Sequence, residues 1–440
     1  MSKPRYTGVL LAGLLLTASV PHAGAAPLST AIAKSIQEHI RSASAAQTEE
    51  TAPARQTGRQ VGFAGLEKTV REKNPTVKAL DRTLAGIKGT DLDAQFAGQY
   101  LQYEAQRTAY QRQIEAYQQA IAALEQHAAD PAIAAQIAAL RINLGVAQGS
   151  LEGANRAIDA LDKAEENARD DLADTVATYE RQFENAKNQL VLGAQSAYLG
   201  AVSIRAGLDT LDRSLAGLDR NLAVVEKQVS LGMASQLTLD SLRQTRGTVL
   251  AQRATLEKQL DGVQNQLALL LGEPAGEAVT VADAPEVSER QLSEMRYETD
   301  LEQAKKNSYA IWSKQDAARK ASNDYEDNVT ATVDAYEAAK LNLEAEKENV
   351  TVAFRALYQD VQDKRAQAAD AQAALALQQR NFAVSELQYN RGMISKNDFL
   401  GAQDELAAKQ DALDAAKLAL FTAYNAYDWA RRGLMNSASS

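Results

Sequence analysis

The chain contains one sequence element twice, 160 residues apart. Segments 221–235 (NLAVVEKQVSLGMAS) and 381–395 (NFAVSELQYNRGMIS) align without a gap and share eight of fifteen residues. The identical pairs are Asn221/Asn381, Ala223/Ala383, Val224/Val384, Glu226/Glu386, Gln228/Gln388, Gly232/Gly392, Met233/Met393 and Ser235/Ser395. Tyr198 and Tyr358 continue the match at the same offset. The chain is therefore an internal duplication, whose single unit cannot usually bury its apolar face alone.

Both copies lie in long stretches that favour helix. Between Pro285 and Gly392 there is neither Gly nor Pro, and Ala, Leu, Glu, Gln, Lys and Asp dominate; most of these are strong helix formers. Apolar residues recur at spacings of three, four and seven, the pattern of a coiled-coil seam. They are Leu242, Val249, Leu256, Leu260, Val263, Leu267 and Leu270 in the first copy, and Leu413, Ala416, Leu420, Ala423 and Tyr427 in the second.

This pattern predicts an all-α fold in which each half is a very long helical hairpin that turns at a Gly-Met-x-Ser element. A segment from about residue 328 to residue 390 would form a helix roughly 95 Å long at 1.5 Å per residue. The longest uninterrupted apolar runs after the N-terminal region are only five residues, as at 267–271. No later stretch is therefore expected to cross a membrane as a helix.

The N-terminal region has the pattern of a secretory signal peptide. Lys3 and Arg5 precede an apolar run at 8–20, and the small-residue sequence 23–25 follows as a cleavage site. The alternative is a retained N-terminal anchor. Since the chain has no cysteine, it has no disulfide and no thiol chemistry. The net charge of −10 argues against nucleic acid as a partner.

Breakers and caps divide the rest of the chain. Gly272 followed by Pro274 predicts a helix stop, and Ser288 with Gln291 resembles a capping box. The expected segments are a signal peptide at 1–26, a leader at 27–60, a first repeat at 61–272, a linker at 273–287, a second repeat at 288–434 and a tail at 435–440.

The first repeat is longer than the second. Asn74 and Asn307 lie in similar passages, but they are 233 residues apart instead of 160. The first repeat therefore holds 73 extra residues, and we place this insert at about 90–162. Its helical period and the turn-forming pair Asp130-Pro131 predict an additional helical hairpin.

The duplicated halves resemble the TolC-type outer-membrane efflux proteins. The features that carry the resemblance are the G-x-x-S turn, which occurs twice, the Leu-Leu-Gly ending at Gly272 and the Asn-Pro pair at Asn74. The resemblance covers about residues 61–434 without the insert. It implies that three subunits form an α-helical barrel, whose inner end meets a periplasmic adaptor coupled to an inner-membrane ABC or RND pump. In that family a β-barrel of two strand pairs per subunit forms the outer end.

The sequence departs from the family at that outer end. Barrel strands would lie between Asn74 and Tyr198 and between Asn307 and Tyr358, but a spanning strand needs about 9–11 residues of alternating type. The only strand-like pieces, 278–281 and 329–333, are short. No barrel strand is recognised, so contact with an outer membrane stays open, and the expected location is the cell envelope, either outer-membrane-associated, periplasmic or in the cell wall.

The resemblance assigns roles to the two turns. Gly232, Met233 and Ser235, with Gly392, Met393 and Ser395, would form hairpin tips that dock the adaptor at the entrance. The plain alternative is that each glycine only caps its helix. Acids near the tips would line the entrance, and the plain alternative for each is a solvated carboxylate or a favourable charge at a helix start. These acids are Asp398, Asp240 and Asp404.

Nothing in the sequence favours an enzyme. Of the three histidines, His22 belongs to the predicted signal peptide and His39 to the leader. No zinc spacing, nucleophile–base set or phosphate loop occurs, so no metal, catalytic or cofactor site is expected. Two function classes remain: a trimeric exit duct for an efflux or type I secretion system, and a coiled-coil envelope spacer without a pore. The duplicated tips favour the duct.

Overall fold

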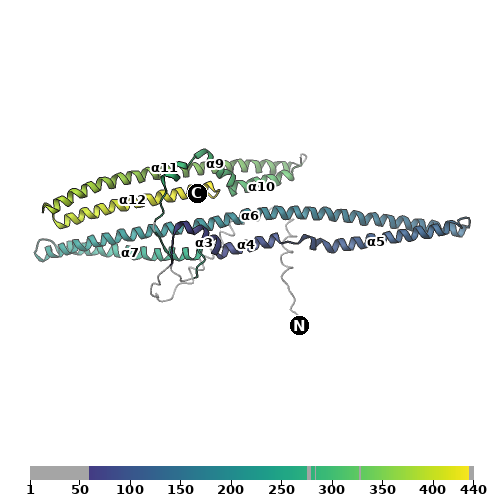
Figure 1. Ribbon diagram of the computed structural model, residues 1–440, viewed down its shortest axis with the longest axis horizontal. Coiled ribbons are helices and arrows are strands. Elements are labelled where there is room, and N and C mark those ends of the chain that lie inside the picture. Colours follow the sequence, from purple (N-terminus) through teal and green to yellow (C-terminus); the bar gives the residue numbers. More distant parts are fainter. Residues whose placement is uncertain (1–58, 275–278, 283, 327–328, 436–440) are drawn as a thin grey trace, which may run out of the picture. The chain divides into compact units, whose positions relative to one another are not determined.

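The computed structural model describes residues 59–274, 279–282, 284–326 and 329–435. The expected signal peptide and nearly all of the expected leader lie outside these residues. Within the described part of the chain, long α-helices pair side by side as hairpins (Figure 1). The all-α prediction is confirmed for these residues, because regular strand is confined to two three-residue segments.

The first repeat is built on one helix of 100 residues, α6 (Pro131–Ser230). At 1.5 Å per residue this helix is roughly 150 Å long. Helix α7 (Gln236–Leu270) packs along the second part of α6, and α5 (Leu92–Glu125) packs along the first part. Two shorter helices precede α5 and also contact α6: α3 (Leu66–Lys73) and α4 (Pro75–Lys88).

The insert is continuous with the first repeat. The sequence predicts a separate additional hairpin at about 90–162, and a turn does occur before Pro131, with Asp130 capping α6. The second helix of this hairpin does not end near residue 162, however, but continues as α6 to Ser230. The reason is that no proline and no left-handed glycine occurs between Pro131 and Ser230, so nothing interrupts the helical hydrogen bonds.

The second repeat has the same hairpin with shorter additions. Helix α11 (Thr330–Asn390) and helix α12 (Lys396–Arg431) pair along their length. Three short helices come before them: α8 (Glu289–Glu294), α9 (Tyr297–Asn307) and α10 (Tyr309–Asn323). Helices α9 and α10 both pack on α11. Ser288 and Gln291 form the capping box that the sequence indicates.

A small sheet joins the start of the first repeat to the linker. Strand β1 (Arg59–Val61), followed by the 3-10 turn η1 (Phe63–Gly65), pairs in parallel with β2 (Val279–Val281). The strand-like pattern at 278–281 thus gives a strand, whereas that at 329–333 was misleading. Residues 330–333 begin α11, because the strong helix formers that follow continue the segment as helix.

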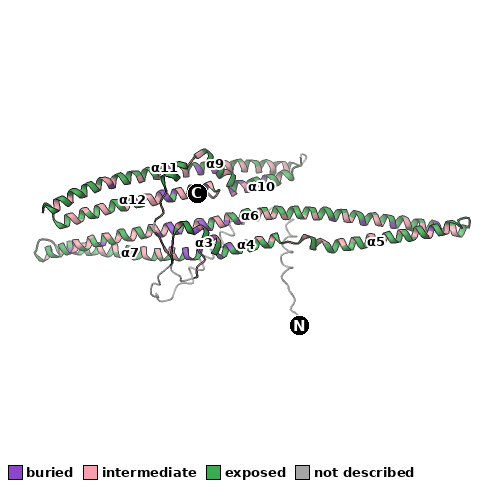
Figure 2. Ribbon diagram, in the orientation of Figure 1, coloured by how far each residue is buried: buried purple, intermediate pink, exposed green. Residues whose placement is uncertain are grey.

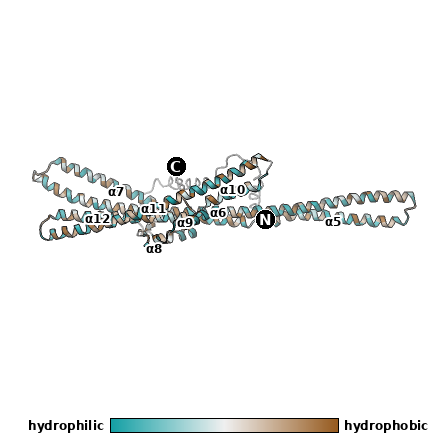
Figure 3. Cartoon of the chain, turned by 90° about the horizontal axis from the view of Figure 1, so that it is seen from above, coloured by the Kyte–Doolittle hydropathy of each residue, from teal (hydrophilic) through white to brown (hydrophobic). Residues whose placement is uncertain are grey.

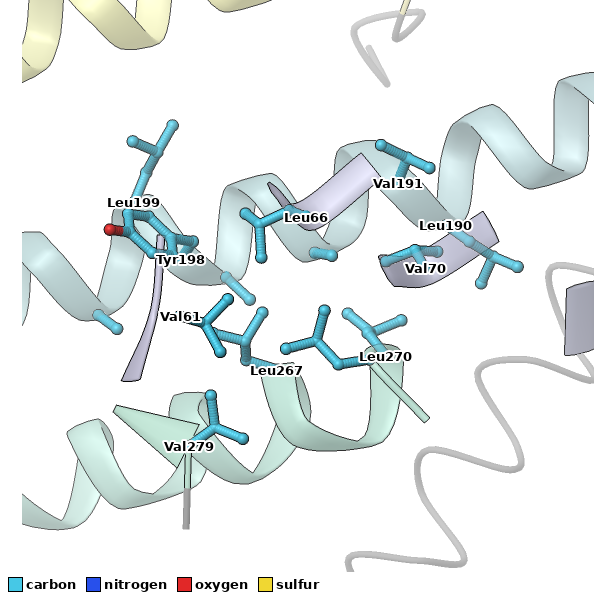
Figure 4. Close-up of a cluster of buried hydrophobic side chains, with 14 of the residues drawn as sticks. Val61, Leu66, Val70, Leu190, Val191, Tyr198, Leu199, Leu267, Leu270 and Val279 are labelled. Atoms are coloured by element: carbon cyan, nitrogen blue, oxygen red, sulfur yellow. The ribbon is translucent and has the colours of Figure 1, made fainter. Parts of the chain in front are cut away.

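The core has two clusters of buried residues, and α12 contributes to both. Figure 4 shows the first cluster, where side chains of α3, α6 and α7 meet the two strands. Elsewhere one narrow stripe of each hairpin helix is half-buried, with few fully buried residues (Figure 2), and hydrophobic and hydrophilic residues alternate along the helices (Figure 3). The seam residues predicted before Gly272 and in the second copy are all buried or half-buried.

In each repeat, an asparagine side chain near the start is hydrogen-bonded to a backbone carbonyl near the end. The amide of Asn74 accepts hydrogen bonds from two N–H groups at the start of α4 and donates from Nδ2 to the carbonyl of Leu270 at 2.8 Å. In the second repeat Ser308 caps α10, and Asn307 donates to the carbonyl of Arg431 at 3.1 Å. Asn74 thus both caps a helix and contacts the end of its repeat. In the second repeat Ser308 caps the helix and Asn307 makes the contact. The structural counterpart of Asn74 as helix cap is therefore Ser308, one residue beyond the pairing that the sequence suggests.

Candidate functional site

Both Gly-Met-x-Ser turns end their first helix in the same way. Gly232 and Gly392 adopt φ of 73° and 70°, the left-handed region that favours glycine. The N–H of Met233 donates to the carbonyl of Gln228 at 2.8 Å, and that of Met393 donates to Gln388 at 2.8 Å. With the accompanying bonds from the two glycine N–H groups, each turn is a Schellman motif, which satisfies the last carbonyls of the helix.

The two serines begin the second helix of each hairpin. The Ser235 side chain accepts from the N–H of Thr238 at 3.1 Å, and that of Ser395 accepts from Asp398 at 3.1 Å. The repeated sequence thus ends one helix and begins the next within five intervening residues, 231–235 in the first copy and 391–395 in the second. This local role accounts for the glycines and serines, but it leaves the exposed Met233 and Met393 unexplained.

Three contacts between α6 and α12 place both turns at the same end of the paired hairpins. They join Gln195 to Trp429, Arg213 to Asp411, and Arg220 to Asp404. In each pair the residue numbers add up to 624, so α6 and α12 run antiparallel in one constant register. Beyond the last pair, α6 ends after ten more residues, at Ser230, and α12 begins eight residues earlier, at Lys396. Both tips therefore lie beyond this pair.

Ion pairs stabilise α6 on both sides at heptad spacing. Acids on one side pair with arginines of α7, and arginines on the other side pair with acids of α12. Hydrogen bonds from Arg253 and Arg246 lower the pKa values of the Asp212 and Asp219 carboxyls below their ordinary value. The pairs are Asp212–Arg253, Asp219–Arg246 and Glu226–Arg243 toward α7, and Arg213–Asp411 and Arg220–Asp404 toward α12.

The two tips have the same backbone conformation but expose different side chains. The first exposes three apolar side chains, Leu231, Met233 and Leu237, at 61%, 74% and 79% of their surface. At the matching positions the second tip carries Arg391, Met393 and Asn397. One tip is therefore mainly apolar and the other mainly polar, and a methionine is the apolar residue that both present.

The three predicted entrance acids have different surroundings. Asp398 belongs to a capping box, in which its carboxylate accepts from the Ser395 N–H at 3.2 Å and from its hydroxyl at 2.8 Å. Asp404 pairs with Arg220 across the two hairpins. Asp240 is exposed and accepts from Gln236 at 3.1 Å. The structure thus brings Asp404 into the α6–α12 contact, while Asp240 and Asp398 begin their own helices.

Sequence reasoning missed the polar residues that hold the hairpins together. Buried Gln195 accepts from Trp429 Nε1 at 2.6 Å and from Asn425 Nδ2 at 3.0 Å. Buried Asp300 accepts from the Tyr427 hydroxyl, and burial followed by this bond raises the pKa of Tyr427. A polar residue within an otherwise apolar seam was the available signal, but its partner lies more than 100 residues away in sequence.

A long cleft of about 1270 Å³ follows the contact between α6, α11 and α12. Mostly small and apolar side chains line it, with Asp360, Lys364, Asp411 and Asp414 among them. In the described residues, no three or more histidine or acidic side chains are grouped so that they could hold a metal. Nor does any helix there combine the length and the apolar character that a membrane crossing requires.

No protein-family model matches the chain, and no curated protein is significantly similar to it in sequence. In structure the chain is similar to TolC-family outer-membrane channels. The outer membrane protein VceC of Vibrio cholerae is 14% identical over 60% of this chain and 75% of its own, with a TM-score of 0.44.

Two further channels are similar to the same degree. CusC is 13% identical, and the match covers 88% of this chain and 96% of CusC, with a TM-score of 0.46. The Campylobacter jejuni outer membrane channel CmeC is 14% identical over 63% of this chain and 69% of its own, with a TM-score of 0.40.

Proposed function

We propose that the chain is the exit duct of an efflux or type I secretion system in the cell envelope, a trimeric TolC-like helical conduit. Its two tips would dock the hairpins of a periplasmic adaptor, which couples the duct to an inner-membrane ABC or RND pump. The observation that supports this proposal most is the pair of matched turns at one end of the α6–α12 contact.

The chemistry of the tips suits docking to another protein. Met233 and Met393 are 74% and 67% exposed, and neither is needed to end its helix, since the glycine and serine do that. Methionine is flexible and polarisable, and such side chains are favoured at adaptable binding surfaces. Three copies would present six tips, three mainly apolar and three mainly polar.

The long helices suit a wall that spans an aqueous compartment. Helix α6 alone is roughly 150 Å long. Asp240 and Asp398 lie near the start of α7 and α12, where they would give the entrance a negative charge that favours cations. Asp404 would line the same entrance further along α12, with its charge balanced by Arg220. No catalytic group is part of the proposal, because transport energy would come from the pump.

A photo-cross-linking residue placed at Met233 or Met393 tests the docking role in cells. We expect each to cross-link to an adaptor protein, whereas the same residue at Ile142, which is 69% exposed near the other end of α6, should not. Deletion of the gene should also sensitise cells to exported compounds. Cross-links at Ile142 but none at either tip, with unchanged export, would favour the alternative of an envelope spacer without a pore.

A further inference from the structure

The first part of helix α6 carries a second stripe of small and apolar residues, on the side that faces away from α5. Its residues are spaced alternately by four and three, as in a coiled-coil seam. The α6 residues that are buried or half-buried in the pairing with α5, such as Ile137 and Leu144, lie two residues from stripe residues and therefore about 200° around the helix. All stripe residues are exposed, Ile142 and Val146 by 69% and 64%. We call this set the outer stripe: Ala135, Ala139, Ile142, Val146, Gly149 and Gly153.

The same face of α6 packs on another helix further along the chain. Asp174 pairs with Arg319 of α10 at 2.8 Å, and the guanidinium of Arg181 lies 5.5 Å from the ring centre of Trp312, also in α10. A heptad step returns to the same face of a coiled-coil helix. From Arg181 and Asp174, further steps of seven lead to Ala160, Gly153, Val146 and Ala139. The outer stripe is therefore the exposed end of a face that the second repeat already uses for packing.

We propose that the outer stripe packs antiparallel against the outer stripe of a second copy of the chain. A two-fold axis would pass α6 between residues 147 and 148, so that the residue numbers of facing pairs add up to 295. Residues 135–160 of the two copies then overlap along roughly 38 Å. The contact lies at the Pro131 end of α6, whereas the Gly-Met-x-Ser turn follows the Ser230 end. It goes beyond the proposed exit duct and does not depend on it.

The outer stripe is complementary to itself in volume, and this is why a second copy fits it. In the proposed register Ile142 of one copy faces Gly153 of the other, and Val146 faces Gly149. A Cβ added at either glycine would meet no other part of the chain within 4 Å, so each glycine leaves room for a bulky side chain. A shift by one heptad would place Ile142 against Val146, or Gly149 against Gly153. The first is crowded and the second leaves a void, and both are destabilising.

The charges around the outer stripe agree with this pairing. The stripe itself contains no charged residue, so the contact buries no charge without a partner. Glu152 is exposed on one flank of the stripe. The two-fold axis brings the same flank of both helices together, and Arg141 of the second copy lies on that flank, two residues from the position that faces Glu152. Arg141 pairs with Glu125 at 3.0 Å within its own chain. The exposed carboxylate of Glu152 is positioned to join this pair from the second copy.

An antiparallel arrangement suits the outer stripe better than a parallel one. In a parallel pair Ile142 would meet its own counterpart, while Gly149 and Gly153 would meet glycines and leave a void. The antiparallel contact is the same patch on both copies, so it is complete with two copies and does not continue into a filament. It would join two chains, or two assemblies of chains, at their α5 ends. The Gly-Met-x-Ser tips would then lie at the far ends, where they remain free for another partner.

Cysteine cross-linking tests the orientation and the register, because the chain contains no cysteine. Two differently tagged full-length chains are coexpressed, one with Ile142→Cys and the other with Gly153→Cys, and are treated with a short bis-maleimide. We expect a product that contains both tags. Ile142→Cys alone should not cross-link to itself, since its two copies would lie about 16 Å apart. In the matched control Leu101→Cys replaces Gly153→Cys. Leu101 is 70% exposed on α5 of the same hairpin, and this chain should give no product with Ile142→Cys.

A second measurement fills the space that the pairing needs. Gly149→Leu should lower the molar mass seen by light scattering twofold, with helicity unchanged by circular dichroism, because the leucine would collide with Val146 of the second copy. Gly98→Leu, also in open space but on α5, should leave the mass unchanged. The double variant Val146→Gly with Gly149→Leu exchanges the large and the small residue and should regain the larger mass.

Three results would each overturn the proposal. The first is an equal molar mass of the parent chain and Gly149→Leu, or an equal effect of Gly98→Leu. The second is a double variant that does not regain the larger mass. The third is cross-linking of Ile142→Cys to itself as strongly as to Gly153→Cys. None of these results concerns adaptor cross-linking at the tips, so the proposed function stands or fails separately.

Discussion

The indole of Trp429 donates a hydrogen bond to Oε1 of Gln195 at 2.6 Å, and this bond joins the two repeats across 234 residues of sequence. Both side chains are buried, and the same oxygen also accepts from Asn425. Because a buried polar atom is costly without a partner, this contact favours one register of α6 on α12 over any that slides by a turn. The ion pairs Arg213–Asp411 and Arg220–Asp404 continue that register toward the tips.

Replacing Gln195 by Leu should destabilise the chain, because two donors would lose their acceptor. The expected loss is about 1–3 kcal/mol in the free energy of unfolding. It can be measured by urea unfolding with tryptophan fluorescence. The double variant Gln195→Leu with Trp429→Phe should recover part of this loss, since the buried indole N–H is then absent. Equal stability of the parent chain and Gln195→Leu would contradict the assigned role.

The four left-handed glycines should fall into two classes on substitution by alanine. An added Cβ would lie 2.6 Å from the Lys73 carbonyl oxygen at Gly272 and closer still to that of Asn307 at Gly433, but in open space at Gly232 and Gly392. The tip variants should therefore lose only about 1–2 kcal/mol, the cost of the left-handed conformation. Gly272→Ala and Gly433→Ala should lose distinctly more, as seen in Tm.

Replacing Gly392 by Val should separate docking from folding. A β-branched residue disfavours the left-handed turn by about 1–2 kcal/mol, which is too little to unfold helices of this length. We expect normal helicity and oligomer size, but loss of adaptor cross-linking and of drug export in cells. Unchanged export and cross-linking would show that this turn does not form the docking surface.

Asp398→Ala should leave docking intact and alter the ion preference of the entrance, although it also removes a helix cap. The variant Asp398→Thr separates the two effects. The matching position in the first repeat is Thr238, whose hydroxyl is hydrogen-bonded to the Ser235 hydroxyl at 2.9 Å. We expect Asp398→Thr to retain helix stability while reducing export of cationic relative to neutral compounds. If only Asp398→Ala changes export, the carboxylate acts through capping and not through charge.

The hairpin of α6 and α7 should lose stability in acid. Arg253 and Arg246 lower the pKa values of Asp212 and Asp219 below the ordinary 3.8, so the unfolded chain binds protons more readily there. The stabilisation is complete well above 3.8 and declines as pH falls through and below it. Asp212→Asn with Asp219→Asn should flatten the dependence of Tm on pH between 5 and 3. Asp159→Asn, on the same helix outside these pairs, should not.

The hairpins and their turns could be predicted from the sequence. The helices follow from heptad spacing and the scarcity of breakers, and the tips follow from Gly232, Ser235 and their repeats, because capping is satisfied within five residues of chain. The strand at 279–281 was visible as a short β-favouring segment, but its partner at Arg59 was not, since a three-residue strand has almost no pattern of its own.

The way in which the hairpins pack against one another could not be predicted from the sequence. The heptad pattern makes every helix able to pack, but it does not say against which neighbour or in which register. The choice comes from contacts between distant residues: Gln195 with Trp429, Arg220 with Asp404, and Asn74 with Leu270. Each contact pairs polar groups that find their partners in only one alignment of the two segments. Neither segment alone shows which residue of the other will be its partner.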